Sequence, residues 1–438
     1  MEKYKKLLQE YVSKKSVSTD PAYAGSIAEQ VEWLQALLTE NGFEVLVVEG
    51  YNNPIVVASY IIDPKLETCL IYGHYDVQPA SKEDGWDTDP FRLAEKDGRL
   101  YARGIVDNKG QNLVHLVTVC DLIKSKKLKY NVKFMIEGNE ETGSSLLGDM
   151  IRDNKELLKS DFVMISDGEL ESGNPALDVA FRGGFNLTLT VKTSDVELHS
   201  GLYGGTAPNA LHELSKVIAG IYSPDNKIAI ENYYEDVDEI TSDERTQAAE
   251  RHFDLDNYKK VTGTKMLLTE KGNNYYVQVG LLPSIEVTGI KSGYMLDGYR
   301  NSIPCEASAK INFRIVLSQK PDKVYKRFVE YVQSVLPSYA TFEAVYADPY
   351  TGVKLKLDNK FIKRAVAKIV TAYGKEPQMN YCGASIPIVT IFAEELGIPN
   401  VLVPMGNGDC RMHATNENFE LKHLEKALKF SELFFQKD

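Results

Sequence analysis

Between residues 26 and 170 the sequence alternates short apolar runs with segments of helical periodicity. The runs FEVLVV, PIVVASYI, TCLIYG, YNVKFMI and FVMIS are rich in β-branched and aromatic residues, whereas SIAEQVEWLQALLTENG repeats apolar residues at helical spacing and ends at Asn41-Gly42. Strands buried on both faces and alternating with helices are typical of α/β proteins. The pattern therefore predicts an α/β domain built on a mixed, mostly parallel sheet.

A different pattern begins near residue 181. FNLTLTVKTSDVEL alternates like a half-exposed antiparallel strand, and the helical segment NALHELSKVIAGI follows it. Two further strands, the helix PDKVYKRFVEYVQSVL and the strand TFEAVYADP complete a β-α-β-β-α-β order, which predicts an α+β ferredoxin-like layer. A charged stretch from 223 to 280 has little periodicity and is interpreted as an insertion into this layer.

The α/β pattern returns from about residue 352, with the helical segment NKFIKRAVAKIVTAYG and the strand NVLVPMG. A chain of 438 residues is long enough for two domains. We therefore expect residues 1–180 and 351–438 to form one domain, and residues 181–350 to form a second domain inserted within it.

The overall charge and the cysteine content exclude several classes of protein. A formal charge of −12 without clusters of Lys or Arg argues against binding to nucleic acid or to an anionic membrane. No apolar run has the length of a membrane span, and the N-terminus lacks the apolar core of a signal peptide, so we expect a cytoplasmic protein. The five cysteines are scattered without CxxC spacing, which supports neither a disulfide framework nor a thiolate zinc site.

Side chains that can bind metals follow three of the apolar runs. The carboxyl ends of strands in an open α/β sheet form the crevice where ligands bind, so these groups could converge. A further aspartate precedes a helix, and a histidine lies in the loop GNGDCRMHATNENF near the C-terminus. In chain order the candidates are His74, Asp76, Asp107, Glu137, Glu140, Glu141, Asp167, Glu169 and His413.

Acidic groups that close together repel one another unless a cation compensates them. Nitrogen and oxygen ligands without cysteine suit Zn²⁺, Mn²⁺ or Co²⁺, and this set is large enough for two metals that share an aspartate. Any one of these residues taken alone could be a helix cap or a satisfied hydrogen-bonding group. The metal site is therefore predicted from the whole set.

Several short motifs occur in order between residues 70 and 420: GHYDVQP, ARGIVDNKG, EGNEETGS, SDGE, ELHSGLYGG and GASIP, followed by the late His413. In order and approximate spacing this series resembles the M20 family of metallopeptidases, and in particular its carnosinase-type dipeptidase branch. The resemblance implies a metallopeptidase catalytic domain with a dinuclear metal centre, interrupted by a lid domain that also forms a homodimer.

The resemblance also implies a role for each matching residue. One metal would be held by His74, Asp107 and Asp167, and the other by Asp107, Glu141 and His413, so that Asp107 bridges them. Asp76 would orient the ring of His74. Glu140 would be the general base that activates the water between the metals and then delivers the proton to the leaving amine. The peptide after Asp107 is expected to be cis.

The resemblance implies a further set of residues that contact the substrate from the lid. His199 in ELHSGLYGG would reach the active site of the neighbouring subunit and stabilise the oxyanion, although the family more often has Asp at the position of Glu197. Arg314 would pair with the terminal carboxylate of the substrate. The remaining predicted substrate contacts are Asn301, Gly383, Ala384 and Ser385.

The other histidines are interpreted as structural or solvated; they are His115, His212, His252 and His423. VYADPY lacks the additional lid histidine of many carnosinase-like relatives, so a preference for histidine-containing dipeptides is not predicted.

The predicted function is hydrolysis of dipeptides or short peptides that have a free carboxyl end. An N-acyl amino acid amidohydrolase, such as a deacylase or desuccinylase, is the alternative, because that branch of the family uses the same metal chemistry. A binding protein without activity is disfavoured, since Glu140 and every expected ligand are present.

Overall fold

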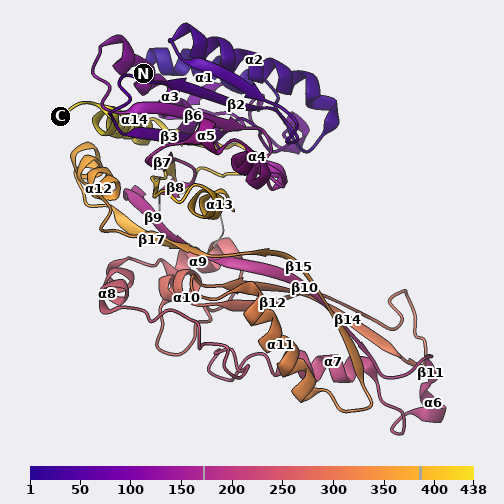
Figure 1. The fold of residues 1–438 in the computed structure, drawn as a ribbon. Coiled ribbons are helices and arrows are strands. Elements are labelled where there is room, and N and C mark those ends of the chain that lie inside the picture. The colour runs from indigo at the N-terminus through magenta and orange to yellow at the C-terminus, as the bar shows by residue number, and fades with distance from the viewer. Residues whose placement is uncertain (171–172, 384–386) are drawn as a thin grey trace. The chain divides into compact units, whose positions relative to one another are not determined.

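The computed structural model describes residues 1–170, 173–383 and 387–438. The chain folds into two compact units (Figure 1). The first consists of Met1–Val179, Leu355–Asn380 and Pro387–Asp438, and the second of Ala180–Lys354 with the short segment that begins at Tyr381.

A six-stranded mixed sheet forms the centre of the first unit, in the order β1-β2-β6-β3-β7-β18. The first two strands pair antiparallel, as do β2 and β6, whereas β6, β3, β7 and β18 are parallel to one another. The carboxyl ends of these four strands therefore lie at the same edge. The strands are β1 (Glu44–Val48), β2 (Ile55–Tyr60), β3 (Thr68–His74), β6 (Asn131–Glu137), β7 (Phe162–Ile165) and β18 (Asn400–Leu402).

Helix α3 (Lys109–Lys124) packs against β3 and contacts α1 and α14, so it is buried along most of its length. A helix enclosed in this way is apolar around most of its circumference, which explains the run LVHLVTVC. Helix α2 covers β1 and β2. The other helices of the unit are α1 (Glu2–Ser13), α2 (Ala24–Glu40), α4 (Leu147–Asp153), α5 (Lys155–Leu158), α12 (Lys360–Tyr373), α13 (Pro387–Glu395) and α14 (Leu421–Phe435).

The remaining small elements lie in the first unit or where the chain passes from one unit to the other. Strands β20, β5 and β4 form a three-stranded sheet, and β8 pairs with β19. Strand β9 leads from the first unit into the second, where its last residues pair with β16. The bounds are β4 (Ala94–Lys96), β5 (Arg99–Tyr101), β8 (Glu169–Leu170), β9 (Ala176–Phe181), β16 (Val353–Lys354), β17 (Gln378–Cys382), β19 (Gly406–Asn407), β20 (Asn418–Glu420), and the 3-10 turns η1 (Pro21–Tyr23), η2 (Lys82–Asp84) and η3 (Glu140–Thr142).

The second unit is built on a four-stranded antiparallel sheet in the order β12-β14-β10-β15. Helices α7 and α11 connect the strands, which gives the predicted β-α-β-β-α-β order of a ferredoxin-like layer. The elements are β10 (Gly183–Lys192), α7 (Ala210–Ala219), β12 (Ser284–Ser292), β14 (Glu306–Ile315), α11 (Pro321–Val335) and β15 (Thr341–Tyr350), with the small elements β11 (Leu198–His199), α6 (Ser200–Tyr203) and β13 (Ser302–Ile303) near one end.

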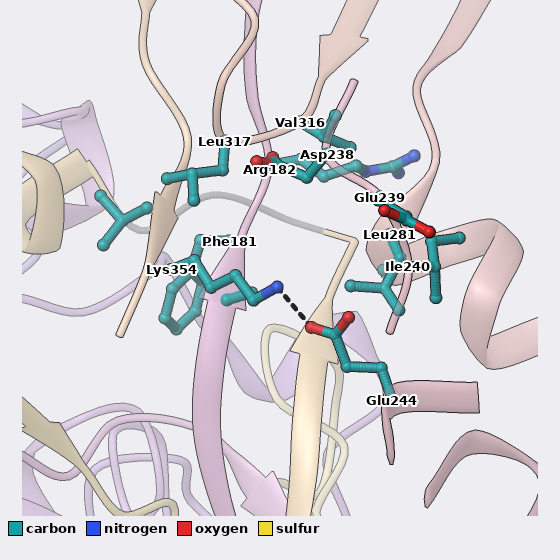
Figure 2. A pocket seen from close by; sticks show the side chains of 13 residues that line it. Phe181, Arg182, Asp238, Glu239, Ile240, Glu244, Leu281, Val316, Leu317 and Lys354 are labelled. Atoms are coloured by element: carbon teal, nitrogen blue, oxygen red, sulfur yellow. Dashed lines mark ion pairs between the residues drawn. The ribbon is translucent and has the colours of Figure 1, made fainter. Parts of the chain in front are cut away.

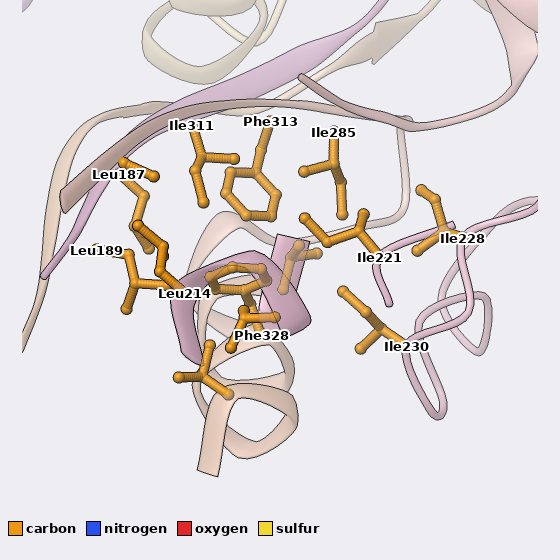
Figure 3. Packing of buried hydrophobic residues seen from close by; sticks show 14 of the residues in the cluster. Leu187, Leu189, Leu214, Ile221, Ile228, Ile230, Ile285, Ile311, Phe313 and Phe328 are labelled. Carbon is orange, nitrogen blue, oxygen red and sulfur yellow. The ribbon is translucent and has the colours of Figure 1, made fainter. Parts of the chain in front are cut away.

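Alternate residues of these strands pack against the two helices and form the core of the second unit (Figure 3). Ile311 and Phe313 of β14 are fully buried with Leu214 of α7 and Phe328 of α11. Each such side chain stabilises the fold by about 1.5–3 kcal/mol through burial alone. The intervening residues of β14 lie on the other face of the sheet, away from the helices.

The charged stretch that the sequence analysis left without regular structure contains three short helices. They are α8 (Ser242–Glu250), α9 (Leu255–Thr262) and α10 (Tyr275–Leu281). Ala248, Tyr276, Val277 and Leu282 form a small core of their own beneath them. Among the described residues, no helix has both the length and the apolar composition needed to cross a membrane.

Candidate active site

The predicted metal ligands meet at the carboxyl edge of the first unit's sheet. His74 is the last residue of β3, and Asp167 follows β7, its parallel neighbour, by two residues. Glu140 and Glu141 lie in η3, just after β6, the parallel neighbour on the other side of β3. The strand directions thus bring together side chains that are far apart in the sequence.

Two groups of ligand-type atoms form there. His74, Asp107 and Asp167 make up one, and Asp107, Glu141 and His413 make up the other; within each group the atoms lie within 4.8 Å of one another. His74 Nε2 lies 3.0 Å from Asp107 Oδ1 and 3.5 Å from Asp167 Oδ2. His413 Nε2 lies 2.7 Å from Asp107 Oδ2 and 3.2 Å from Glu141 Oε2. The two carboxylate oxygens of Asp107 therefore face different groups.

Asp107 is held in place by Glu417, a residue to which the sequence analysis assigned no role. The buried Glu417 carboxylate accepts hydrogen bonds from the backbone nitrogens of Val106 and Asp107, at 2.8 and 3.1 Å, and from Arg103 Nη1 at 2.9 Å. The peptide that joins Asp107 to Asn108 is cis, as the resemblance predicted. Glu417 lies four residues after His413, but no local pattern marks it as a support for a distant loop.

Asp76 contacts both the histidine ligand and the loop that bears the glutamates. Its backbone oxygen is 3.1 Å and its carboxylate 3.3 Å from His74 Nδ1, which directs Nε2 toward the ligand groups. The same carboxylate accepts hydrogen bonds from the backbone nitrogens of Glu140 and Glu141, at 3.3 and 3.1 Å, and from Ser18 Oγ at 2.7 Å. One buried acid therefore fixes the positions of three predicted site residues.

The charges of the site fit a metal centre. Burial raises the pKa of Glu140 to about 8, and the negative charges of Asp167 and Asp107 add to the shift. Burial also raises the pKa of Asp167, whereas hydrogen bonds to Asp107 and Glu141 raise the pKa of His413 to about 10. In the protein alone, bound protons compensate the crowded carboxylates. Divalent cations would replace those protons, so the donor set suits them.

Two other strand-end glutamates lie outside both ligand groups. Glu137 accepts hydrogen bonds from the hydroxyls of Tyr72 and Ser144, at 2.6 and 2.8 Å. Glu169 accepts a hydrogen bond from Cys410 Sγ at 3.2 Å. Side chains alternate along a strand, so residues near the same strand end can point to different partners.

The other predicted residues belong to the second unit. His199 is exposed, and its Nδ1 accepts a hydrogen bond of 3.0 Å from the backbone nitrogen of Gly201. Asn301 is also exposed, and its backbone oxygen accepts a hydrogen bond of 3.0 Å from Ser200 N. The two segments are joined by the pairing of β11 with β13. They place His199 and Asn301 at the same end of this unit.

Arg314 lies on β14 and donates a hydrogen bond of 2.7 Å from Nη1 to the hydroxyl of Tyr350. Gly383 lies in the short segment of the second unit that follows Tyr381, and its carbonyl accepts a hydrogen bond of 2.9 Å from Arg182 Nε. Ala384 and Ser385 lie outside the described residues. Sequence reasoning assigned no role to Arg182 or Tyr350, since a single Arg or Tyr beside a strand carries no recognisable signal.

A separate hollow of about 350 Å³, part of it open to solvent, lies within the second unit (Figure 2). Phe181, Leu281 and Leu317 contribute apolar surface, and Lys354 forms an ion pair with Glu244. None of the predicted site residues lines this hollow.

Residues 70–437 match Peptidase family M20/M25/M40. The chain belongs to this family. The Beta-Ala-His dipeptidase of Rattus norvegicus is 30% identical over 389 residues, which cover 87% of this chain and 79% of the relative. The Cys-Gly metallodipeptidase of Schizosaccharomyces pombe is 29% identical over 441 residues, covering 96% and 92%.

Solved structures of family members share the fold. The M20 family metallo-carboxypeptidase Sso-CP2 from Sulfolobus solfataricus matches with a TM-score of 0.83 at 29% identity, over 99% of each chain. Human carnosine dipeptidase 1 matches with a TM-score of 0.77 at 26% identity, over 99% of this chain and 95% of that one. The predicted fold class and the predicted M20 membership are confirmed, and the chain is a metal-dependent peptidase.

Proposed function

We propose that this M20 peptidase hydrolyses dipeptides that have a free C-terminal carboxylate, using two divalent ions, Zn²⁺ or Mn²⁺, with Co²⁺ as a further possibility. The observation that carries the proposal is the position of Asp107, whose two oxygens face two different groups of ligand-type atoms. Relatives named as dipeptidases align with most of the chain, which supports the choice of substrate. In this proposal the first unit is the catalytic domain, and the second is a lid that also forms the homodimer.

Each residue of the chain then has a distinct task. Metal ions at the two groups would polarise the scissile carbonyl and lower the pKa of the attacking water. Glu140 accepts a proton from this water and passes it to the leaving amine, a task for which the hydrogen bond from its backbone nitrogen to Asp76 positions it. Arg314 binds the carboxylate of the substrate. His199 donates a hydrogen bond to the carbonyl oxygen as negative charge develops on it.

Exposed apolar residues near His199 support the homodimer. They flank β11 and the loop before β13, and monomeric proteins rarely expose so many large apolar side chains in two neighbouring segments. A second copy of the chain is the partner we propose for them, because the same end of the unit presents the exposed His199, which in this proposal serves the neighbouring subunit. These residues are Val196, Leu202, Tyr203, Met295, Leu296 and Tyr299.

Metal analysis tests the two-ion centre. Protein purified without chelator should contain about two divalent ions per chain, because Asp107 contributes to both ligand groups. Asp107→Ala should lose both ions. Glu169→Gln should keep both, since Glu169 lies outside the two groups and contacts Cys410. Full activity in protein that holds no metal would refute the proposed centre.

Substrate assays on the same protein preparation distinguish dipeptidase from amidohydrolase activity. The alternative function, hydrolysis of N-acyl amino acids, would use the same ligand groups and the same Glu140. Assays with free dipeptides and with N-acetyl and N-succinyl amino acids compare the two directly. We expect the dipeptides to have the higher kcat/KM, and the reverse order would assign the chain to the alternative.

Removal of the Arg314 guanidinium tests the carboxylate contact. Arg314→Ala should lower kcat/KM for free dipeptides about 10- to 100-fold, because a hydrogen bond to a charged group contributes about 1.5–3 kcal/mol. Cleavage of the corresponding dipeptide amides should fall much less, since they present no anion. If kcat/KM fell equally for the free dipeptides and for their amides, the role of Arg314 would be structural.

A further inference from the structure

The neighbours of Arg314 lie in one row across the sheet of the second unit. Strand pairing places Ser284 of β12 opposite Arg314, and Gly184 of β10 opposite Arg314 on its other side. Tyr350 of β15 lies opposite Gly184 and completes the row. Residues directly opposite each other in antiparallel strands share a face, so all four lie on the face of the sheet opposite the helix-covered core.

An irregularity in β15 puts Tyr350 in this row. Between the pairs Asn186–Ala347 and Gly184–Tyr350, β10 advances by two residues and β15 by three, which is a β-bulge. Asp348, within the extra segment, has a positive φ of 52°. Without the bulge, Pro349 would face Gly184, and no hydroxyl would be available to Arg314.

Gly184 leaves the space that the hydrogen bond needs. A Cβ atom at this position would lie 2.8 Å from the Tyr350 hydroxyl oxygen and 2.4 Å from the backbone oxygen of Phe313. The Tyr350 hydroxyl therefore lies over the glycine and reaches Arg314 Nη1 at 2.7 Å. Bulge, glycine and tyrosine together fix one edge of the Arg314 guanidinium.

A second arginine lies close to Arg314. Arg182 reaches the same face, where its Nη1 donates hydrogen bonds to Ser284 Oγ at 3.3 Å and to Leu282 O at 3.2 Å, while its Nε donates to Gly383 O. Burial lowers the pKa of Arg182 to about 10, and the nearby charge of Arg314 adds to the effect, while the negative charge of Glu286 opposes it. In the described part of the chain, neither arginine forms an ion pair with a carboxylate.

We propose that Tyr350 is a positioning residue that holds Arg314 ready to bind the C-terminal carboxylate of the substrate. Two guanidinium groups without carboxylate partners repel each other, so a free Arg314 side chain would turn toward solvent. The Tyr350 hydroxyl occupies only Nη1 and leaves the Nε and Nη2 donors of Arg314 for a bidentate contact with an anion. This inference rests on the proposed dipeptidase function and adds to it the residue that orders the carboxylate site.

Tyr350→Phe removes the hydroxyl and keeps the ring, which makes it the appropriate variant. It should lower kcat/KM for free dipeptides about tenfold, mainly through KM, as expected for the loss of a hydrogen bond to a charged group. Hydrolysis of the dipeptide amides should change less than about twofold. In the Arg314→Ala background the additional substitution should have no effect on either substrate, because the guanidinium it positions is gone.

Tyr346→Phe is the matched control. Tyr346 lies on the same strand, and its hydroxyl donates a hydrogen bond of 2.8 Å to Asp322, so its removal should leave both substrates unaffected. The positioning role would be overturned if Tyr350→Phe lowered kcat/KM equally for free dipeptides and for dipeptide amides. It would also be overturned if the loss added to that of Arg314→Ala in the double variant. If Arg314→Ala lowers the hydrolysis of free dipeptides and of dipeptide amides equally, Arg314 does not bind the substrate carboxylate. The proposed role of Tyr350 is then refuted as well.

Discussion

Replacing Glu140 with glutamine should lower kcat by a factor of roughly 10²–10⁴, the range typical of general acid–base catalysis. Glutamine has nearly the same shape but accepts no proton, so the water is no longer activated and the leaving amine is no longer protonated. The fold and the metal content should remain, because Glu140 belongs to neither ligand group and its link to Asp76 runs through the backbone nitrogen. Steady-state kinetics and metal analysis of the same sample measure both effects.

The control for this variant is a glutamate far from any proposed chemistry. Glu156 is exposed on α5, so Glu156→Gln should leave kcat unchanged. A Glu140→Gln enzyme with near-normal turnover would transfer the role of the base to another group. Loss of metal along with activity would instead show that Glu140 supports the ligands.

The sheet and the convergence of the ligands could be predicted from the sequence because both follow from local patterns. Buried strands such as β3 and β7 are short apolar runs, and the carboxyl ends of parallel strands meet at one edge. A ligand at the end of each strand, such as His74 or Asp167, is therefore placed by secondary structure alone. His413 is different, since only the resemblance to a family predicted that its loop reaches this edge.

The short helices between residues 242 and 281 were missed because each is only seven to nine residues long, which is too short to establish a period. Their start signals were nevertheless present. Thr241 and Glu244 form a capping box at the start of α8, and the side chains of Asp254 and Asn274 cap α9 and α10. Capping residues would have located these helices where periodicity could not.

The supporting contacts could not be predicted, because each depends on a register or a loop path set by the whole fold. Glu417 accepts hydrogen bonds from a loop much earlier in the chain: Val106, in that loop, precedes Glu417 by 311 residues. Tyr350 meets Arg314 only because β15 contains one extra residue. A one-residue change of register moves a side chain to the other face of a sheet, and no composition rule specifies it.

His199→Ala should lower kcat by about 10²–10³, as removal of one oxyanion donor does in other enzymes. His199 Nδ1 accepts a hydrogen bond from Gly201 N, so the proton of a neutral imidazole resides on Nε2, which is then available as a donor. Metal content should be unchanged, since the ligand groups do not include His199. His212→Ala, at an exposed histidine on α7 of the same unit, is the matched control and should retain full activity.

Mixing two inactive variants determines whether His199 acts on the partner subunit. In a heterodimer of His199→Ala and Glu140→Gln, one active site would combine the intact Glu140 of the first chain with the intact His199 of the second. Random exchange makes half of all dimers heterodimers with one complete site each, so activity should return to roughly a quarter of the wild-type value. An affinity tag on one variant measures the exchange independently. Exchange without recovery of activity would mean that His199 serves its own chain or has no catalytic role, and the exposed apolar residues around it would then support assembly alone.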